Sequence, residues 1–244
     1  MEISRRNVLQ LGAAAAAAGP LLGLGPAWAQ QQASRNPDVI RIGIAAKGPR
    51  HSDPNLTTQG SDNWATEQIY EQLVRPEDGT FAVKPEEYLP TLATSWTSSA
   101  DARTWTFKLR EGVQFHKGYG EMTSDDVVYS FRRAIASGTN TTLMANVAEV
   151  VADGRYAVRM TLKSPDPLFL GTCVFLNNAS IVSRKAAEEM GDAFATNAVG
   201  TGPYELVKFD NQWGTVLKRH EGYWGPKAKI ANVECVYIAD TTAR

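Results

Sequence analysis

The chain has few of the residues on which metal binding and covalent catalysis depend. It contains two cysteines and three histidines among its 244 residues. The cysteines, Cys173 and Cys235, are too far apart in the sequence to form a short metal-ligand motif. An oxidising compartment would permit a disulfide between them. The sequence leaves that pairing open, and we favour two separate buried thiols, because unpaired cysteine behaves as a small apolar residue.

Sequence motifs that position a nucleophile, a nucleotide or a zinc ion are also missing. There is no Gly-x-Ser-x-Gly elbow, and the histidines (His51, His116 and His220) are scattered along the chain. Gly200-Thr201-Gly202 lacks the third glycine of a dinucleotide-binding loop, and Pro203 follows where a helix would have to begin. We therefore predict that the protein is not an enzyme and has neither a cofactor nor a metal site.

An excess of one charge is lacking as well. The chain has 25 Lys and Arg residues against 26 Asp and Glu residues, for a net charge of −1. Nucleic acids and anionic membranes are bound by clustered Lys and Arg side chains. The even balance therefore argues against both as the main partner. The composition is that of an ordinary globular protein, long enough for one or two domains.

Residues 1–29 have the pattern of an export signal. Arg5 and Arg6 precede a run rich in Ala, Leu and Gly, and Ala27-Trp28-Ala29 has the small-x-small pattern of a cleavage site. The paired arginines favour export by the twin-arginine (Tat) route, and the Ala27-Trp28-Ala29 pattern favours cleavage after Ala29. We therefore predict a periplasmic protein. Glycine–proline pairs interrupt a run that would need about 20 continuous apolar residues to span a membrane. We therefore expect no direct membrane anchor, and a polar linker at 30–37.

Alternating apolar and polar residues predict several strands. These are expected at 38–45, 104–110 and 156–162, in a hairpin of 204–209 with 215–219, and at 232–238. In the first strand Ile40, Ile42 and Ile44 share a face that we expect to be buried. The last strand has apolar residues on both faces, which is typical of a central strand. Val113 and Phe115 predict a short partner strand after the turn that follows 104–110.

Three helices are predicted from capping residues. The clearest follows Thr123 and begins with Asp125 and Asp126, where the helix dipole favours negative charge. Adjacent helical residues point about 100° apart, so we interpret this acidic pair as part of a cap and not as catalytic carboxylates. Its apolar stripe is expected at Val127, Val128, Phe131 and Ile135. The other two helices are expected after Ser61, with Ala65, Ile69 and Leu73 on one face, and from Ser183 to Gly191.

Several tryptophans could line a ligand cleft. These are Trp64, Trp96, Trp105, Trp213 and Trp224. Strand alternation assigns Trp105 to the core. Trp213 and Trp224 lie in predicted loops, where both a structural and a ligand-binding role stay open.

An ordered series of motifs runs along the chain after the signal. It comprises Ser52-Asp53-Pro54, Ile69-Tyr70-Glu71-Gln72-Leu73, Leu92-Ala93-Thr94-Ser95-Trp96, Trp105-Thr106-Phe107-Lys108-Leu109-Arg110, Phe115-His116, Asp125-Asp126-Val127-Val128-Tyr129-Ser130, Gly202-Pro203-Tyr204, Tyr223-Trp224-Gly225, and Asp240 near Ala243-Arg244. In this series the chain resembles the N-terminal half of the family 5 extracellular solute-binding proteins. These are the oligopeptide, dipeptide and nickel receptors of ABC importers. Each motif alone is weak, but their order is specific.

Two positions depart from the family's pattern. Lys117 stands where the family usually has an aspartate, and Tyr119-Gly120-Glu121-Met122 adds about one residue to the link that follows. A glycine is expected near Ala102. These differences fall in surface turns, so they put the local turn geometry in question and leave the fold unaffected.

The resemblance implies a particular α/β fold. It is periplasmic-binding-protein-like (type II, cluster C), with lobe I, an extra small α/β domain, and the second lobe missing. Residues 38–70 and 185–244 would form lobe I, truncated at the hinge, and residues 71–184 would form the extra domain. Ligand in such proteins lies between two lobes that close about a hinge. Half of the pocket would then be absent, so we expect residues 30–244 alone to bind solute weakly.

The resemblance also implies a function. The protein would be the substrate-binding component of an ABC transporter, capturing a peptide or similar small solute for delivery to the permease in the inner membrane. Thr58, Gln59 and Gly60 match a stretch whose backbone contacts ligand. The solute stays open among peptide, nickel, sugars, opines and haem. Alternatives are a non-binding fragment or stand-alone interaction module and, disfavoured, a Tat-exported metal or redox enzyme.

Overall fold

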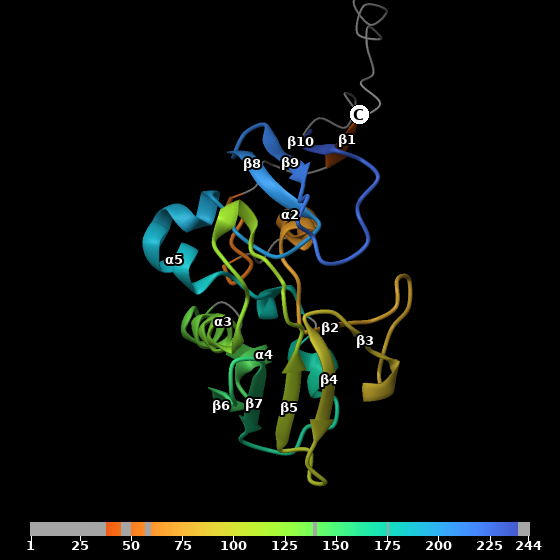
Figure 1. The fold of residues 1–244 in the computed structure, drawn as a ribbon, viewed down its shortest axis with the longest axis vertical. Helices are drawn as coiled ribbons and strands as arrows, with labels where there is room; N and C mark the ends of the chain where they lie inside the picture. The colour runs from red at the N-terminus through yellow and green to blue at the C-terminus, as the bar shows by residue number, and fades with distance from the viewer. Residues whose placement is uncertain (1–37, 45–49, 57–59, 139–140, 175, 239–244) are drawn as a thin grey trace, which may run out of the picture. The chain divides into compact units, whose positions relative to one another are not determined.

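A computed structural model describes residues 38–44, 50–56, 60–138, 141–174 and 176–238. The predicted signal with Arg5 and Arg6, the linker at 30–37, and Asp240 lie outside these residues. So do Thr58 and Gln59. Two four-stranded sheets account for most of the strands, and they are drawn in Figure 1.

The first sheet has the strand order β1-β10-β9-β8. Its members are β1 (Val39–Ile44), β8 (Tyr204–Asp210), β9 (Gly214–Arg219) and β10 (Asn232–Tyr237). β1 and β10 run parallel, and the other two pairs are antiparallel. The predicted hairpin is confirmed as β8 and β9, and β10 is central as expected. The hairpin turn is tight because the Asp210 carboxylate accepts hydrogen bonds from the N–H groups of Gln212 and Trp213.

The prediction that one face of β1 is buried is wrong. Ile40 is 41% exposed, and Ile42 and Ile44 are only half-buried. β1 lies at the edge of the first sheet, next to β10 alone. Alternation therefore identified which isoleucines share a face, but the described part of the chain places little against that face.

The second sheet is antiparallel throughout, with the order β4-β5-β7-β6. Its members are β4 (Ala93–Ser98), β5 (Thr104–Leu109), β6 (Val147–Ala152) and β7 (Ala157–Leu162). The strands predicted at 104–110 and 156–162 are confirmed, and Trp105, Phe107 and Leu109 are all buried. A short pair, β2 (Val74–Arg75) and β3 (Leu89–Pro90), stands apart from both sheets.

The partner strand predicted at Val113 and Phe115 is wrong. β5 pairs with β4 and β7, while the 112–122 segment forms a compact turn closed by an isolated bridge between Gln114 and Glu121. Gly112, Gly118 and Gly120 all have positive φ there, which lets the chain reverse repeatedly. Val113 and Phe115 are nevertheless buried.

Both departures from the family's pattern coincide with unusual backbone geometry. Ala102 (φ 53°) and Lys117 (φ 57°) are the two non-glycine residues of the described segments with positive φ. Left-handed backbone costs an L-residue about 1–2 kcal/mol. The resemblance leads us to expect a glycine near Ala102 and an aspartate at 117. Backbone strain thus falls at the two positions where this chain has a different residue.

We expect the Ala102→Gly substitution to stabilise the protein by about 0.5–1 kcal/mol, because relief of the left-handed strain exceeds glycine's added entropy in the unfolded chain. Urea denaturation of both proteins measures the change. The matched control is Ala100→Gly in the same exposed turn, where φ is not positive. That substitution should destabilise by about 0.5–1 kcal/mol. Equal effects at the two positions would contradict the explanation.

The three predicted helices are present as α2 (Gly60–Ile69), α3 (Ser124–Ala136) and α5 (Arg184–Met190). The Asp126 carboxylate accepts from the Thr123 N–H at 2.9 Å, which confirms the cap. In α5 the Ser183 hydroxyl accepts from the Ala186 N–H, and Gly191 ends the helix. Two details differ: Ile135 is 39% exposed while Ala134 is buried, and α2 ends before Leu73 and begins before Ser61.

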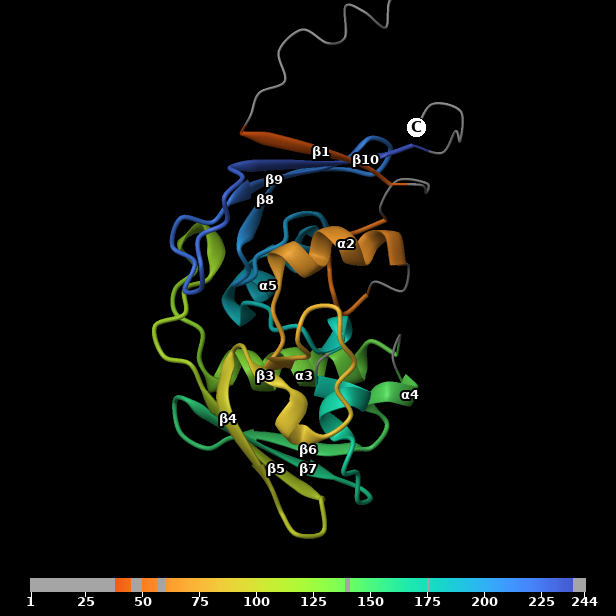
Figure 2. The same ribbon diagram turned by 90° about the vertical axis from the view of Figure 1, so that its right-hand side faces the viewer.

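The remaining elements are single turns. They are α4 (Thr141–Met144), η1 (Pro85–Glu87), η2 (His116–Gly118), η3 (Leu170–Val174), η4 (Asn177–Ala179) and η5 (Gly191–Thr196). α2 packs against β8, and α3 packs against β6, β7 and α5, as Figure 2 shows. One hydrophobic core runs through both sheets. It contains Cys173 and Cys235 as separate free thiols, the arrangement that we favoured.

Candidate functional site

The segment that leads into the predicted ligand loop is buried and held firmly. Of that loop, Thr58 and Gln59 lie outside the described residues, and Gly60 is the first residue of α2. Just before it, Ser52, Asp53 and Asn55 are at most 2% exposed. Polar side chains are seldom buried so completely unless they are hydrogen-bonded. Their partners therefore indicate what fixes the start of this loop.

Asp53 and Asn55 are bound by an arginine from α3. Arg133 donates to both carboxylate oxygens of Asp53, and to the Asn55 Oδ1 atom at 2.8 Å. The Asp53 carboxylate also accepts from the Asn55 N–H at 3.0 Å. The hydrogen bonds that Arg133 donates to Asp53 raise the pKa of its guanidinium. A bidentate ion pair of this kind fixes both the position and the orientation of the two side chains. The 52–55 segment is therefore anchored to α3.

Amide groups tie the same segment to two further elements. The Asn55 side chain donates to the Asn178 carbonyl in η4 at 2.9 Å. The neighbouring Asn177 amide donates to the Asn63 Oδ1 atom and the Thr66 hydroxyl on α2, at 3.0 and 3.2 Å. The described residues before 57 and after 59 therefore belong to a hydrogen-bonded framework that includes α2, α3 and η4. Its amide and hydroxyl groups are hydrogen-bonded to one another, which holds these elements in place.

A second cluster surrounds Glu71, which is 8% exposed. Its carboxylate accepts hydrogen bonds from the Thr201 hydroxyl (2.9 Å), the Tyr223 hydroxyl (2.8 Å) and the Trp224 indole N–H (2.9 Å). Burial raises the pKa of Glu71 despite these three donors. The Arg110 guanidinium lies 3.9 Å from the centre of the Trp224 ring. Trp224 thus joins distant segments of the fold, which is a structural role.

A third cluster brings together two of the histidines. The His116 Nδ1 atom accepts from the Gly200 N–H at 3.3 Å, so its Nε2–H donates to the Gly202 carbonyl at 2.9 Å. The His220 ring lies edge-on, 4.8 Å away. Burial lowers the pKa of His116 to about 3, so the ring is neutral. Cβ atoms at positions 200 and 202 would collide with the backbone of α2, which explains both glycines without a nucleotide.

None of the three clusters has the arrangement of a catalytic site. The first two are filled by mutual hydrogen bonds, and in the third the buried His220 Nε2 atom has no hydrogen-bond partner among the described residues. A nucleophile paired with a base is not among them. Within the described residues, no three His, Cys, Asp or Glu side chains lie together as metal ligands would. The described helices are likewise too short or too polar to cross a membrane.

The two-sheet fold is that of the periplasmic binding proteins. The binding protein MoaA of A. tumefaciens in complex with mannopinic acid superposes with a TM-score of 0.79 at 31% identity, over 84% of this chain and 42% of that one. The periplasmic binding protein DppA of Helicobacter pylori, in complex with the peptide STSA, gives 0.76 at 29% identity, over 84% and 44%.

The chain belongs to family 5 of the bacterial extracellular solute-binding proteins, whose model of the middle region matches residues 87–244. It is 30% identical to the dipeptide-binding protein of Escherichia coli over 80% of this chain and 40% of that protein. It is 28% identical to heme-binding protein A of Haemophilus influenzae, over 88% and 43%. The chain therefore spans about two-fifths of the length of these relatives.

Proposed function

We propose that the protein is the substrate-binding component of an ABC importer. It captures a peptide or a similar small polar solute in the periplasm and presents it to the permease in the inner membrane. Family membership supports this role, as do the ligands named for its relatives: dipeptide, haem, a tetrapeptide and mannopinic acid. The observation that carries the proposal is the buried Asp53–Arg133–Asn55 cluster, which anchors the segment entering the solute loop.

In this proposal, Thr58, Gln59 and Gly60 contact the solute, and the protein is not an enzyme. Residues 38–70 and 185–244 form lobe I, and residues 71–184 form the extra small α/β domain. Two observations support these boundaries: β1 pairs with β10 across the chain, and all four strands of the second sheet lie between residues 93 and 162. Arg5 and Arg6 direct export by the Tat route, with cleavage after Ala29.

Saturation-transfer NMR tests the proposed solute contact. We expect an alanine dipeptide or mannopinic acid to receive saturation from the full chain, with a dissociation constant on the order of 1 mM. Replacing Thr58 and Gln59 together by proline removes two backbone N–H donors and should reduce the transfer several-fold. The control is Thr97→Ala on the exposed side of β4, which should leave it unchanged. Undiminished transfer in the double variant would contradict the assignment of the loop.

A further inference from the structure

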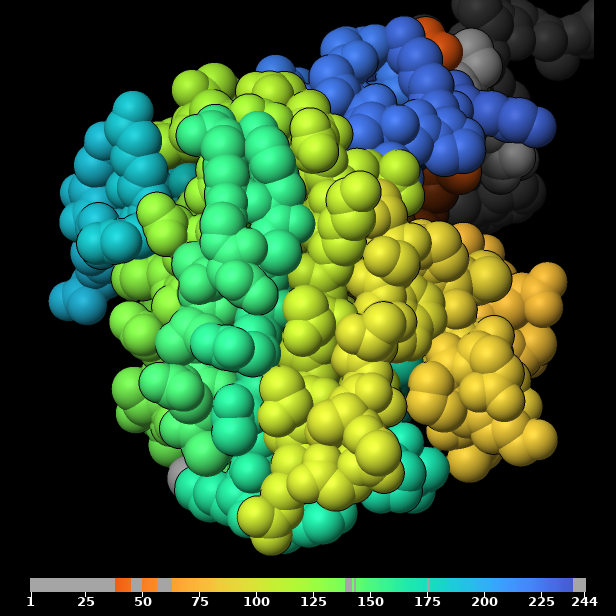
Figure 3. All heavy atoms as spheres, turned by 60° about the horizontal axis from the view of Figure 1, so that its bottom comes forward, coloured from red at the N-terminus to blue at the C-terminus, as the bar shows by residue number. Residues whose placement is uncertain are grey.

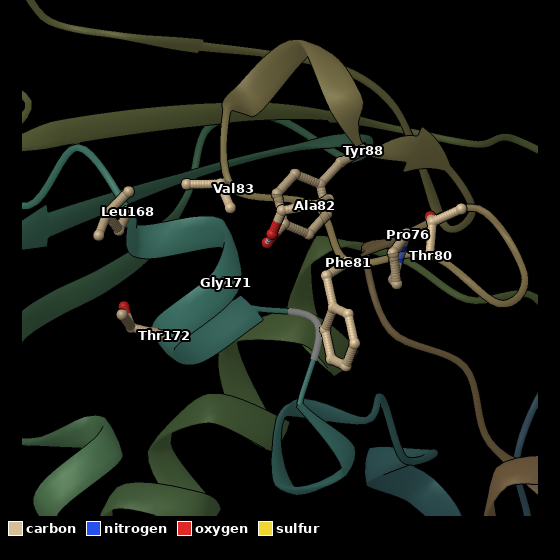
Figure 4. A pocket seen from close by; sticks show the side chains of 9 residues that line it. All are labelled: Pro76, Thr80, Phe81, Ala82, Val83, Tyr88, Leu168, Gly171 and Thr172. Carbon is tan, nitrogen blue, oxygen red and sulfur yellow. Dashed lines mark hydrogen bonds between the residues drawn. The ribbon is translucent and has the colours of Figure 1, made fainter.

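An apolar pocket of about 310 Å³ lies within the 71–184 segment, formed by residues that the solute-binding proposal does not use. It opens between the loop that joins β2 to β3 and the π-helical turn η3. Figure 4 shows the side chains around it. Pro76, Phe81, Val83 and Tyr88 come from the loop, and Leu168 and Gly171 come from the other wall.

Large apolar side chains at the rim are unusually exposed. Phe81 is 98% exposed, Val83 60% and Leu168 48%. Figure 3 shows the loop that carries Phe81, in orange to yellow, as a protrusion from the surface. Contiguous exposed apolar side chains around a hollow mark an interaction site more often than a random feature of the surface. A single protruding aromatic residue is also typical of the anchors that dominate protein interfaces.

The loop is braced in a way that holds this apolar rim in place. The Tyr88 hydroxyl donates to the Ala82 carbonyl at 2.8 Å. The Glu87 carboxylate accepts from the N–H groups of Val83 and Lys84 at 2.8 and 3.1 Å. On the other wall Gly171 lies so close to Tyr88 that a Cβ atom there would be 2.6 Å from the hydroxyl. These contacts preorganise the pocket, which reduces the entropy lost when a partner binds.

The surroundings of the pocket are acidic. The carboxylates of Glu87 and Asp166 adjoin it, because they accept hydrogen bonds from the Val83 N–H and the Thr172 hydroxyl of its walls, and neither has an ion-pair partner among the described residues. Glu77 and Glu86 lie on the same loop but line other pockets. Asp78 is paired with Arg75 at 2.6 Å. Lys84 is the one other cation on these segments. The whole chain is close to neutral, so this local excess of negative charge favours a positively charged partner.

We propose that this pocket is a docking site for a cationic amphipathic segment of a partner protein. One apolar side chain of that segment fills the pocket, and its Lys and Arg residues face the carboxylates of Glu87 and Asp166 beside it. A protein segment suits the site better than a small molecule, because Phe81 and Val83 stand outside the hollow and need a larger partner to cover them. The site is separate from the proposed solute loop and does not depend on it.

Fluorescence anisotropy with the full chain tests the proposal. The probe is a fluorescein-labelled, acetylated and amidated nonapeptide in which Leu-Phe is flanked by Lys and Arg. We expect a dissociation constant on the order of 100 µM, as for a small transient contact, and weaker binding at high salt. The double variant with Phe81→Ser and Leu168→Lys should bind at least tenfold more weakly, since both side chains are exposed and the fold should persist.

Three controls separate the possible outcomes. Val207→Ser, at another exposed apolar residue, and the Thr58 and Gln59 proline variant should both bind the probe like the unmodified chain. A probe flanked by Glu in place of Lys and Arg should not bind. Undiminished binding to the Phe81 and Leu168 variant would overturn the proposal, as would equal binding of the Glu probe. Sedimentation that finds a dimer dissociated by Phe81→Ser would overturn it in favour of self-association.

Discussion

Replacing Asp53 by alanine is expected to lower the free energy of unfolding by about 3–5 kcal/mol, the usual cost of breaking a buried ion pair by removing one partner. The Asp53 side chain is fully buried and that of Arg133 is 25% exposed, so solvent screens the pair little. The substitution leaves the guanidinium without its carboxylate and removes a hydrogen bond from Asn55. Urea denaturation followed by circular dichroism measures the loss.

The matched control is an exposed pair of the same chemistry. Arg184 and Glu188 lie one turn apart on α5, with side chains that are 52% and 51% exposed. Because such pairs contribute about 0–1 kcal/mol, Glu188→Ala should change the stability little. A second comparison replaces Asp53 and Arg133 together by leucine and methionine. This pair of substitutions should recover much of the lost stability. A small effect of Asp53→Ala alone would mean that the ion pair does not anchor the segment.

The same substitution should also weaken solute binding, if the solute loop follows the anchored segment as we propose. In Asp53→Ala the 52–55 segment loses its attachment to α3, so the loop samples more conformations before it binds. Saturation transfer to the alanine dipeptide should therefore fall even at temperatures where the variant is fully folded. In the leucine–methionine double variant, transfer should stay low although stability returns, because the attachment through Asn55 Oδ1 to Arg133 is lost.

The strands that the sequence predicts best are those with one well-covered face. Trp105, Phe107 and Leu109 alternate with polar residues, and the core covers them completely. β1 has the same alternation, but Ile40 stays exposed at the sheet edge. Periodicity shows which side chains share a face, whereas the burial of that face depends on elements distant in the sequence. The strand predicted at Val113 and Phe115 was wrong for another reason. The positive-φ glycines of the 112–122 segment turn the chain before a strand can form.

The three polar clusters show the same limit for function. Asp53, Glu71 and His116 all stand in motifs that carry the family resemblance, so the sequence singled out their neighbourhoods. Their partners could not be read from it, because Asp53 and Arg133 are 80 residues apart and Glu71 and Trp224 are 153 apart. A single sequence carries no sign of such pairings. The histidines likewise appear scattered in sequence, and only the fold brings His116 against His220.

The burial of His116 makes a pH dependence of stability the second large expected effect. His116 has a pKa of about 3 when folded, lowered mainly by burial, against about 6.5 when unfolded. Above pH 6.5 both states are neutral at this residue, and it contributes no pH dependence. Between pH 6.5 and about 3 the unfolded chain binds a proton that the folded chain does not. The free energy of unfolding should therefore fall by up to about 1.4 kcal/mol for each unit by which the pH is lowered in this range.

The hydrogen bonds explain why the folded ring resists protonation. Nδ1 already accepts from the Gly200 N–H and Nε2 already donates to the Gly202 carbonyl, so an added proton would face another donor. His220 and Lys117 nearby lower the pKa further. A glutamine can supply one acceptor and one donor without titrating. The stability of His116→Gln should therefore fall less steeply below pH 6.5, and its deficit relative to the unmodified chain should shrink. Parallel stability curves from pH 7.5 to 4 would refute this role for His116.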